Sequence, residues 1–217
     1  MTIHAVVFDY GGTLTEPYRT AFRPEYYEER GLDMLALREV LAPLLGHDGD
    51  AADVLAHRCE RGEVELSEMV AALEARVPGA GALFDPKDSP FSVLELNPDM
   101  VALAGDVRRA GLKVGVLSNI FQGMDGGYQL DPDEWDAIVL SCRVGMRKPN
   151  PAVYRHVCEL IGVAPREVLY LDDFEAMCAG ASAVGMTAIR VRDHKAAVAE
   201  ARGLLGLPAT TAGGSLR

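Results

Sequence analysis

The sequence lacks the features that mark membrane-spanning and nucleic-acid-binding proteins. It contains no apolar run of about 18 residues, which a membrane-spanning helix needs. It has no block of Lys or Arg, and its net charge is −11. Phosphate-backbone binding depends on basic patches. We therefore expect neither a membrane nor a nucleic acid as partner.

Cysteines are few, and a secretion signal is missing. The chain has four cysteines in 217 residues, and they form no CxxC pair and no metal-site spacing. The N-terminal stretch has no basic region followed by an apolar core, because its apolar run from Ile3 leads directly into Asp9. Scattered, reduced thiols and an uncleaved N-terminus predict a cytoplasmic protein. The sequence does not indicate an oligomeric state.

The first strongly patterned stretch is a short apolar strand that ends in an aspartate. Residues 3–8 are mostly apolar and rich in β-branched side chains, and Gly11 and Gly12 follow closely. This composition is typical of a strand buried on both faces of a parallel sheet. Asp9 then stands at the strand end where α/β proteins bind their ligands. From this stretch alone, Asp9 could equally serve only to cap the turn.

The rest of the chain is first helical and then alternates between helix and strand. Residues 17–80 are predicted to form a helical insert with helices near 34–44, 51–61 and 66–77, and 79–98 are expected to be the return connection. From residue 100 helices alternate with strands, which are predicted at 112–117, 137–140, 168–171 and 187–191. This alternation predicts an α/β fold, a parallel sheet in a three-layer α/β/α sandwich. The predicted division is a core of residues 1–16 and 81–217 and a helical subdomain of residues 17–80.

Polar side chains follow three of the predicted strands. They are Asp9, the pair Ser118 and Asn119, and the pair Asp172 and Asp173. Lys148 precedes the helix between the third and fourth strands. Because parallel strands end at the same edge, we expect these groups to meet there. A carboxylate, hydroxyl and amide donors, a cation and an acidic pair suit phosphoryl transfer through an aspartyl intermediate, and Mg²⁺ would hold the acidic groups together.

Each of these groups also has an ordinary structural interpretation. Taken singly, Ser118 and Asn119 could form a turn, and Asp172 and Asp173 could cap a helix. Lys148 alone could be a solvated side chain. The joint placement at successive strand ends favours a functional site over these alternatives.

Four motifs in order give the chain a resemblance to the haloacid dehalogenase (HAD) superfamily. They are VFDYGGTL at 7–14, VLSN at 116–119, GMRKPNP at 145–151 and LDD at 171–173. The resemblance covers essentially the whole chain. It implies a Rossmann-like core and identifies the insert of residues 17–80 as a helical cap that closes over the site and selects the substrate.

The resemblance also implies a role for each motif residue. It makes Asp9 the nucleophile of a phosphatase that acts on a small phosphorylated metabolite. It implies that the following residues contact the phosphoryl group or its charge: Ser118, Asn119 and Lys148. It implies a Mg²⁺ site made of these residues: Asp9, Gly11 through its backbone carbonyl, Asp172 and Asp173.

One position departs from the family pattern. HAD phosphatases usually carry a second aspartate two residues after the nucleophile, which protonates the leaving group and later activates water, whereas this chain has Gly11. Losing a general acid–base group typically costs a factor of about 10²–10⁴ in rate. Glu16, His47 and His57 are candidate substitutes, as is an ordered water. Arginines 143 and 147 are expected on a solvated face rather than in a basic rim.

Two other functions fit parts of the pattern. HAD dehalogenases also lack the second aspartate, so a metal-independent 2-haloacid dehalogenase is one alternative, although the Asp172–Asp173 pair favours a metal. A binding or regulatory module on the HAD fold, with chemistry weakened by Gly11, is the other. The Gly11-Gly12 stretch also resembles a phosphatase-like branch similar to the N-terminal domains of epoxide hydrolases.

Overall fold

A computed structural model describes residues 2–17, 24–33, 37, 54–85, 89 and 94–208. Its centre is a sheet of five parallel strands in the order β3-β2-β1-β4-β5. The strands are β1 (Ala5–Phe8), β2 (Lys113–Ser118), β3 (Ala137–Leu140), β4 (Val168–Asp172) and β5 (Thr187–Arg190). The predicted parallel sheet is confirmed, and the strand predicted first in the sequence is the central one.

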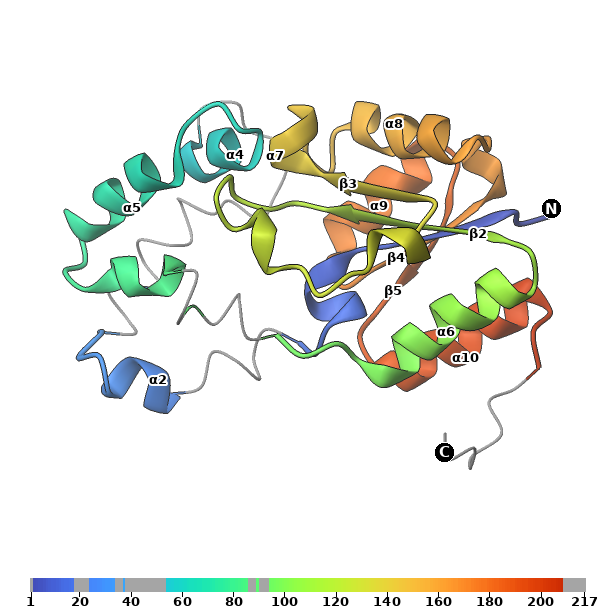
Figure 1. Ribbon diagram of the computed structural model, residues 1–217, viewed down its shortest axis with the longest axis horizontal. Helices are drawn as coiled ribbons and strands as arrows, with labels where there is room; N and C mark the ends of the chain where they lie inside the picture. Colours follow the sequence, from blue (N-terminus) through green and yellow to red (C-terminus); the bar gives the residue numbers. More distant parts are fainter. Residues whose placement is uncertain are drawn as a thin grey trace.

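Helices cover both faces of this sheet (Figure 1). They are α6 (Pro98–Arg109) and α10 (His194–Leu205) on one face, and α8 (Pro151–Ile161) and α9 (Glu175–Ala183) on the other. Alternate residues of β1 point to opposite faces: Val6 and Phe8 pack towards α6 and α10, and Val7 packs towards α8. All four residues of β1 are fully buried. These contacts confirm the three-layer α/β/α sandwich.

Local signals in the sequence set where two of these helices begin. The Asn97 side chain accepts hydrogen bonds from two backbone N–H groups of α6, and Pro98 is the first helical residue. Asn150 caps α8 by accepting from one backbone N–H, that of Ala152, and Pro151 is the first residue of that helix. Proline fits the first helical turn because its missing N–H would have no partner there.

A helical insertion separates β1 from α6 and has its own hydrophobic cluster. Its elements are α2 (Pro24–Glu28), α4 (Leu55–Glu60), α5 (Leu66–Glu74) and the 3-10 turn η2 (Ala80–Phe84). Phe121 and Met124, from the loop after β2, join this cluster. Figure 1 shows the insertion beside the carboxyl ends of the strands. The helix predicted near residues 34–44 lies outside the described residues apart from Leu37, and η2 falls in the stretch expected to be a connection.

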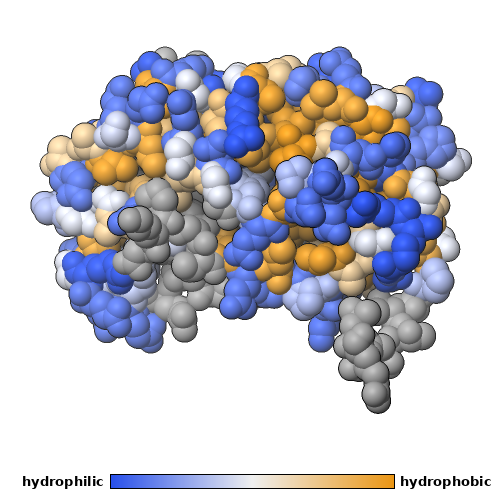
Figure 2. Space-filling view, in the orientation of Figure 1, coloured by the Kyte–Doolittle hydropathy of each residue, from blue (hydrophilic) through white to orange (hydrophobic). Residues whose placement is uncertain are grey.

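Short helical turns complete the described chain. They are η1 (Tyr10–Leu14), η3 (Asp125–Gly127), η4 (Pro132–Glu134), α7 (Ser141–Val144) and η5 (Pro165–Glu167). Hydrophobic residues gather over the middle of the face seen in Figure 2. Ile138 of β3 and Trp135 just before it are partly buried against the core. Within the described ranges, no helix has the length and apolar character needed to cross a membrane.

Candidate active site

The end of β1 places Asp9 between the ends of two neighbouring strands. Phe8 pairs with Val116 of β2 and with Leu171 of β4, and the Asp9 backbone N–H donates to the Leu171 carbonyl at 2.8 Å. Asp9 therefore leaves the sheet beside the ends of β2 and β4. The chain then turns through η1, where Gly12 adopts a φ of 77° that favours glycine.

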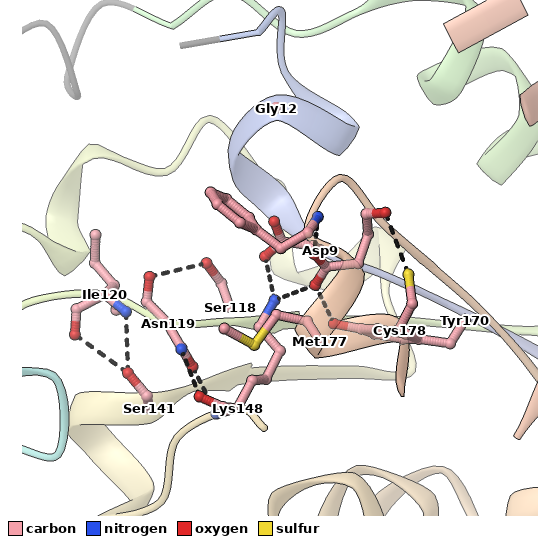
Figure 3. A network of polar contacts seen from close by, with 12 residues as sticks. Asp9, Gly12, Ser118, Asn119, Ile120, Ser141, Lys148, Tyr170, Met177 and Cys178 are labelled. Carbon is pink, nitrogen blue, oxygen red and sulfur yellow. Dashed lines mark hydrogen bonds and ion pairs between the residues drawn. The ribbon is translucent and has the colours of Figure 1, made fainter. Parts of the chain in front are cut away.

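A buried lysine joins two of the predicted carboxylates (Figure 3). The Lys148 ammonium donates to Asp9 Oδ1 at 2.6 Å and to Asp172 Oδ2 at 2.7 Å. The Lys148 side chain is only 3% exposed and that of Asp172 is fully buried. A buried charge is tolerated only when it is paired and hydrogen-bonded. The solvated-side-chain interpretation of Lys148 is therefore wrong.

The two neighbouring aspartates at the end of β4 have different surroundings. Asp172 Oδ2 also accepts from the Tyr170 hydroxyl at 2.5 Å, and its Oδ1 accepts from the Phe174 backbone N–H at 2.9 Å. Both oxygens of Asp172 are thus used within the protein. Asp173 Oδ1, in contrast, is buried and has no hydrogen-bond partner. An unsatisfied buried oxygen costs free energy, so it indicates that a ligand completes the site.

Burial and mutual repulsion raise the pKa values of two acidic groups of this site, Asp9 and Asp173. Burial raises the pKa of Asp9 to about 7, with Lys148 opposing the rise and Asp172 adding to it. Burial, and then the charges of Asp9 and Asp172, raise the pKa of Asp173 to about 8. Burial alone would lower the pKa of Lys148, but the carboxylates of Asp172 and Asp9 outweigh it and raise that pKa. The lysine is therefore a fixed cation.

The acidic groups fit a hard divalent cation. Asp9, Asp172 and Asp173 each offer a carboxylate oxygen, and these atoms lie within 4.8 Å of one another. A methyl group on Gly12 would lie 2.7 Å from Asp173 Oδ2, so the glycine leaves this carboxylate its room. Clustered carboxylate oxygens are the donors that Mg²⁺ prefers. The residues present therefore fit the predicted Mg²⁺, with the unpartnered Asp173 Oδ1 as the most direct sign.

Asn119 ties the end of β2 to the lysine segment. Its side-chain amide donates to the Lys148 carbonyl at 3.0 Å, and its carbonyl oxygen accepts from the Lys148 backbone N–H at 2.8 Å. Ser141 at the start of α7 bonds both backbone groups of Ile120 next to it. The Asn119 side chain thus contacts the Lys148 backbone, which gives it a positioning role within this geometry.

Ser118 lies at the same edge and has a partner that the sequence did not indicate. Its hydroxyl lies 2.6 Å from the hydroxyl of Tyr128, in the loop after β2. The Tyr128 ring stacks on Tyr10, with ring centroids 3.9 Å apart. No sequence motif marks Tyr128. The only available signal was its position in a glycine-containing loop that follows a strand end at the site.

Two of the three residues suggested as substitutes for the missing aspartate have other surroundings. Glu16 accepts from the Asn97 side chain at 2.7 Å, at the start of α6. His57 is fully buried in α4 of the insertion. His47 lies outside the described residues.

Arg147 corrects another expectation. It was expected on a solvated face, yet it is only 3% exposed, and its Nε donates to Glu60 Oε2 of α4 at 2.6 Å. The neighbouring insertion covers this arginine, which composition alone could not indicate. Arg143 is exposed as expected and pairs with Asp125.

Comparison with known proteins shows which family the chain resembles. The family model described as haloacid dehalogenase-like hydrolase matches residues 3–185. The chain is 28% identical to bifunctional epoxide hydrolase 2 of Sus scrofa over 95% of its own length and 40% of that protein. It is 34% identical to phosphatase MT3486 of Mycobacterium tuberculosis over 43% of this chain and 45% of that one. The chain therefore spans less than half the length of these two relatives.

Solved structures share the fold at low identity. A HAD family enzyme of Bacteroides thetaiotaomicron, solved with magnesium and inorganic phosphate, has a TM-score of 0.62 at 18% identity and covers 87% of this chain and 93% of its own. The L-2-haloacid dehalogenase RSc1362 has a TM-score of 0.60 at 21% identity, covering 88% and 87%. With the family model matched over most of its length and the sheet and strand-end residues described above, the chain belongs to the haloacid dehalogenase-like hydrolase family.

Proposed function

We propose that the protein is a cytoplasmic, Mg²⁺-dependent phosphatase that cleaves a small phosphomonoester through an aspartyl-phosphate on Asp9. The observation that carries this proposal is the acidic site itself, in which Lys148 bridges Asp9 and Asp172 while Asp173 Oδ1 is buried without a partner. The names of the matched phosphatases, one of them a glyceraldehyde 3-phosphate phosphatase of Methanopyrus kandleri, support a phosphorylated metabolite as substrate. Four free cysteines agree with a reducing compartment.

In this proposal Asp9, Asp173 and the Gly11 carbonyl hold Mg²⁺ directly. Asp172 supports the site through Lys148, because both of its oxygens already accept hydrogen bonds from protein groups. When bound, Mg²⁺ supplies positive charge that neutralises the carboxylates and the phosphoryl oxygens.

The side chains divide the proposed chemistry among them. Lys148 orients Asp9 through its 2.6 Å contact and favours the ionised form that attacks phosphorus. Ser118 donates its hydroxyl to a phosphoryl oxygen, and Asn119 fixes the Lys148 backbone. Groups held in place before the reaction stabilise developing charge without reorganising.

We further propose that residues 17–80 act as a cap that selects the substrate. The separate hydrophobic cluster of the insertion supports this, and so does its place beside the strand ends (Figure 1). The cluster includes Leu83 and Phe84, so the cap could extend a few residues beyond the predicted boundary.

The first test is hydrolysis of p-nitrophenyl phosphate with and without Mg²⁺. This ester has a good leaving group and needs little help from a general acid. Wild-type turnover should depend on Mg²⁺ and disappear in Asp9→Asn. Asp136→Asn is the matched control, since Asp136 pairs with Lys113 at the start of β2, away from the strand ends, and should leave the rate unchanged. Absence of Mg²⁺-dependent turnover in the wild type would contradict the proposal.

A binding or regulatory module is the second candidate, and Gly11 is the observation that favours it. Without a side chain at this position the chain lacks the usual acid–base group. Phosphate binding without turnover, with function unchanged in Asp9→Asn, would support this candidate. Chelator-insensitive halide release from a 2-haloacid would instead support the metal-independent dehalogenase.

A further inference from the structure

The proposed reaction needs a proton donor, and the Gly11 position cannot supply one. When phosphorus leaves an alcohol oxygen, that oxygen requires a proton unless it is a weakly basic leaving group. Asp9 and Asp173 are committed to attack and to the metal in the proposed function, and Lys148 is held by two carboxylates. A further O–H group at the site is therefore needed as the proton donor.

Tyr128 brings such a group to the phosphoryl-binding edge. Its hydroxyl lies 2.6 Å from Ser118 Oγ, and either oxygen can be the donor. Ser118 is the residue proposed to hold a phosphoryl oxygen. The leaving ester oxygen is bonded to the same phosphorus as the oxygen that Ser118 would hold, so a donor at this site has to lie next to Ser118, as the Tyr128 hydroxyl does.

The Tyr128 ring is fixed against the turn that carries the glycine. It stacks on Tyr10, the residue before Gly11, with centroids 3.9 Å apart and planes at 37°. The Gln129 backbone N–H donates to the Tyr10 hydroxyl at 3.1 Å, which anchors the same loop a second time. Fixed rings of this kind hold a polar tip in place at little entropic cost.

The other end of this loop is bound to the insertion. Phe121 and Met124 are buried in the cluster of the insertion, and Gln122 donates to Glu65 at 3.3 Å. The loop that carries Tyr128 thus contacts the nucleophile turn at one end and the insertion at the other.

We propose that the Tyr128 hydroxyl is the acid–base group of this enzyme, in place of the aspartate missing at position 11. This inference rests on the proposed phosphatase function. In the first step a bond forms between Asp9 and phosphorus, the bond from phosphorus to the leaving oxygen breaks, and the Tyr128 proton passes to that oxygen. In the second step the tyrosinate takes a proton from water as the water oxygen attacks phosphorus and the bond to Asp9 breaks. Protons and charges balance over the cycle.

The test compares phosphate esters whose leaving groups differ in basicity. The kcat/KM values of the wild type, Tyr128→Phe and Tyr10→Phe are measured with Mg²⁺ on p-nitrophenyl, phenyl and propyl phosphate. Tyr128→Phe keeps the ring stack and should leave p-nitrophenyl phosphate nearly unaffected but lose a factor of about 10²–10⁴ on propyl phosphate. Tyr10→Phe removes the hydroxyl of the stacked ring and leaves the Ser118–Tyr128 contact in place. It should therefore change kcat/KM by the same factor on all three esters.

Two results separate this inference from the proposed function. If Tyr128→Phe lowers kcat/KM by the same factor on all three esters, or does not lower it, Tyr128 only positions Ser118 or packs. The inference is then overturned, while the phosphatase proposal survives. If the wild type shows no Asp9-dependent turnover of p-nitrophenyl phosphate, both fail together. Should Tyr128→Phe not fold, the wild type alone decides, because a proton donor predicts a shallow dependence of kcat/KM on leaving-group basicity and a steep dependence overturns the inference.

Discussion

At the scale of single residues, the two aspartates at the end of β4 differ in their hydrogen bonds. Asp172 uses both oxygens on Lys148, Tyr170 and the backbone, whereas Asp173 keeps a buried oxygen without a partner. The first is suited to holding the lysine and the second to holding a cation. Adjacent residues of one type thus differ in what their oxygens are free to bind.

Replacing Gly12 by alanine should damage the cation site. The new methyl group would lie 2.7 Å from Asp173 Oδ2 and displace this carboxylate. Gly111→Ala is the matched control, because Gly111 has a φ of 78°, close to the 77° of Gly12, with nothing within 4 Å of the added methyl. Both variants should lose about 1–2 kcal/mol of stability from the left-handed backbone, but only Gly12→Ala should bind Mg²⁺ more weakly in calorimetry. Equal Mg²⁺ affinity in the two variants would contradict this prediction.

The acidic site should make the metal-free protein less stable as pH rises. The folded-state pKa values of Asp9 and Asp173 are raised to about 7 and about 8, from about 3.9 in an unfolded chain. Folding therefore favours the protonated forms. Their stabilising contribution is present in full below about pH 4 and is lost as the pH rises to about 8.

Asp173→Asn should reduce the loss of folding stability that accompanies rising pH in the metal-free protein. At pH 8 without metal, the variant should unfold at a higher temperature than the wild type, by about 2–4 °C for each kcal/mol regained. At pH 4 the two should be nearly equal. Added Mg²⁺ should raise the unfolding temperature of the wild type at pH 8 but not that of the variant. Thermal unfolding at the two pH values checks this prediction. It would be contradicted if the unfolding temperature of the wild type rose more between pH 4 and pH 8 than that of the variant.

Residues at strand ends were accessible to sequence reasoning, and residues fixed by distant contacts were not. Asp9 and Lys148 could be placed at one edge because parallel strands end together. Tyr128 and Arg147 could not, since the first is placed by a loop and the second is buried by α4. The direction of a side chain outside a regular element depends on tertiary contacts that no local pattern encodes.

At the scale of elements, α9 packs against the segment that carries Lys148 and Pro149. Gly180 of α9 lies against the residue that follows Lys148: a methyl there would come 2.9 Å from Pro149 Cβ and 3.0 Å from its carbonyl oxygen. The Tyr154 hydroxyl of α8 would be 2.9 Å away. The close approach of α8, α9 and this segment thus depends on one glycine.

Two glycine substitutions in helices should therefore have opposite effects. Gly105→Ala in α6 meets only the end of the Arg109 side chain at 3.4 Å and should stabilise the protein by about 0.5–1 kcal/mol through helix propensity. Gly180→Ala should destabilise it by about 1–3 kcal/mol through overpacking and should lower turnover by shifting Lys148. Denaturant unfolding and p-nitrophenyl phosphate hydrolysis measure both effects. A stabilised, fully active Gly180→Ala would show that the segment adapts freely.

Regular elements were predicted more reliably than short ones. The strand at residues 137–140 has the predicted bounds, and α8 begins at the predicted Asn150–Pro151 signal. The four-residue helix α7 and the turn η2 were missed. They are too short to show a helical period, and their packing against neighbouring elements determines them.

At the scale of the whole molecule, a partly buried ion pair joins the insertion to the core. Arg147 precedes Lys148 and donates to Glu60 of α4. Gly62, just after α4, approaches the Cys142 carbonyl of α7 so closely that an added methyl would lie 2.5 Å from it. The insertion is therefore in direct contact with the segment that carries the lysine.

Glu60→Gln should loosen this contact. It removes the carboxylate charge from the Arg147–Glu60 pair, and hydrogen bonds between charged groups are worth about 1.5–3 kcal/mol. We expect faster limited proteolysis within residues 54–85 and a lower unfolding temperature. Glu63→Gln is the control, because the Glu63–Arg61 pair is on the same insertion but Glu63 is exposed, and exposed pairs contribute little. Identical proteolysis of the two variants would argue against the contact.

The central place of β1 in the sheet has a consequence for biosynthesis. Ala5 pairs with Lys113 on one side and Val168 on the other, and Asp9 meets its lysine 139 residues along the chain. Pairing between such distant segments must wait until the intervening chain exists. A ribosome therefore releases an apolar strand that finds neither neighbour until β2 and β4 have followed. Asp9 therefore has no lysine contact until residue 148 has been made, and β1 is an apolar segment that chaperones can shield in the meantime.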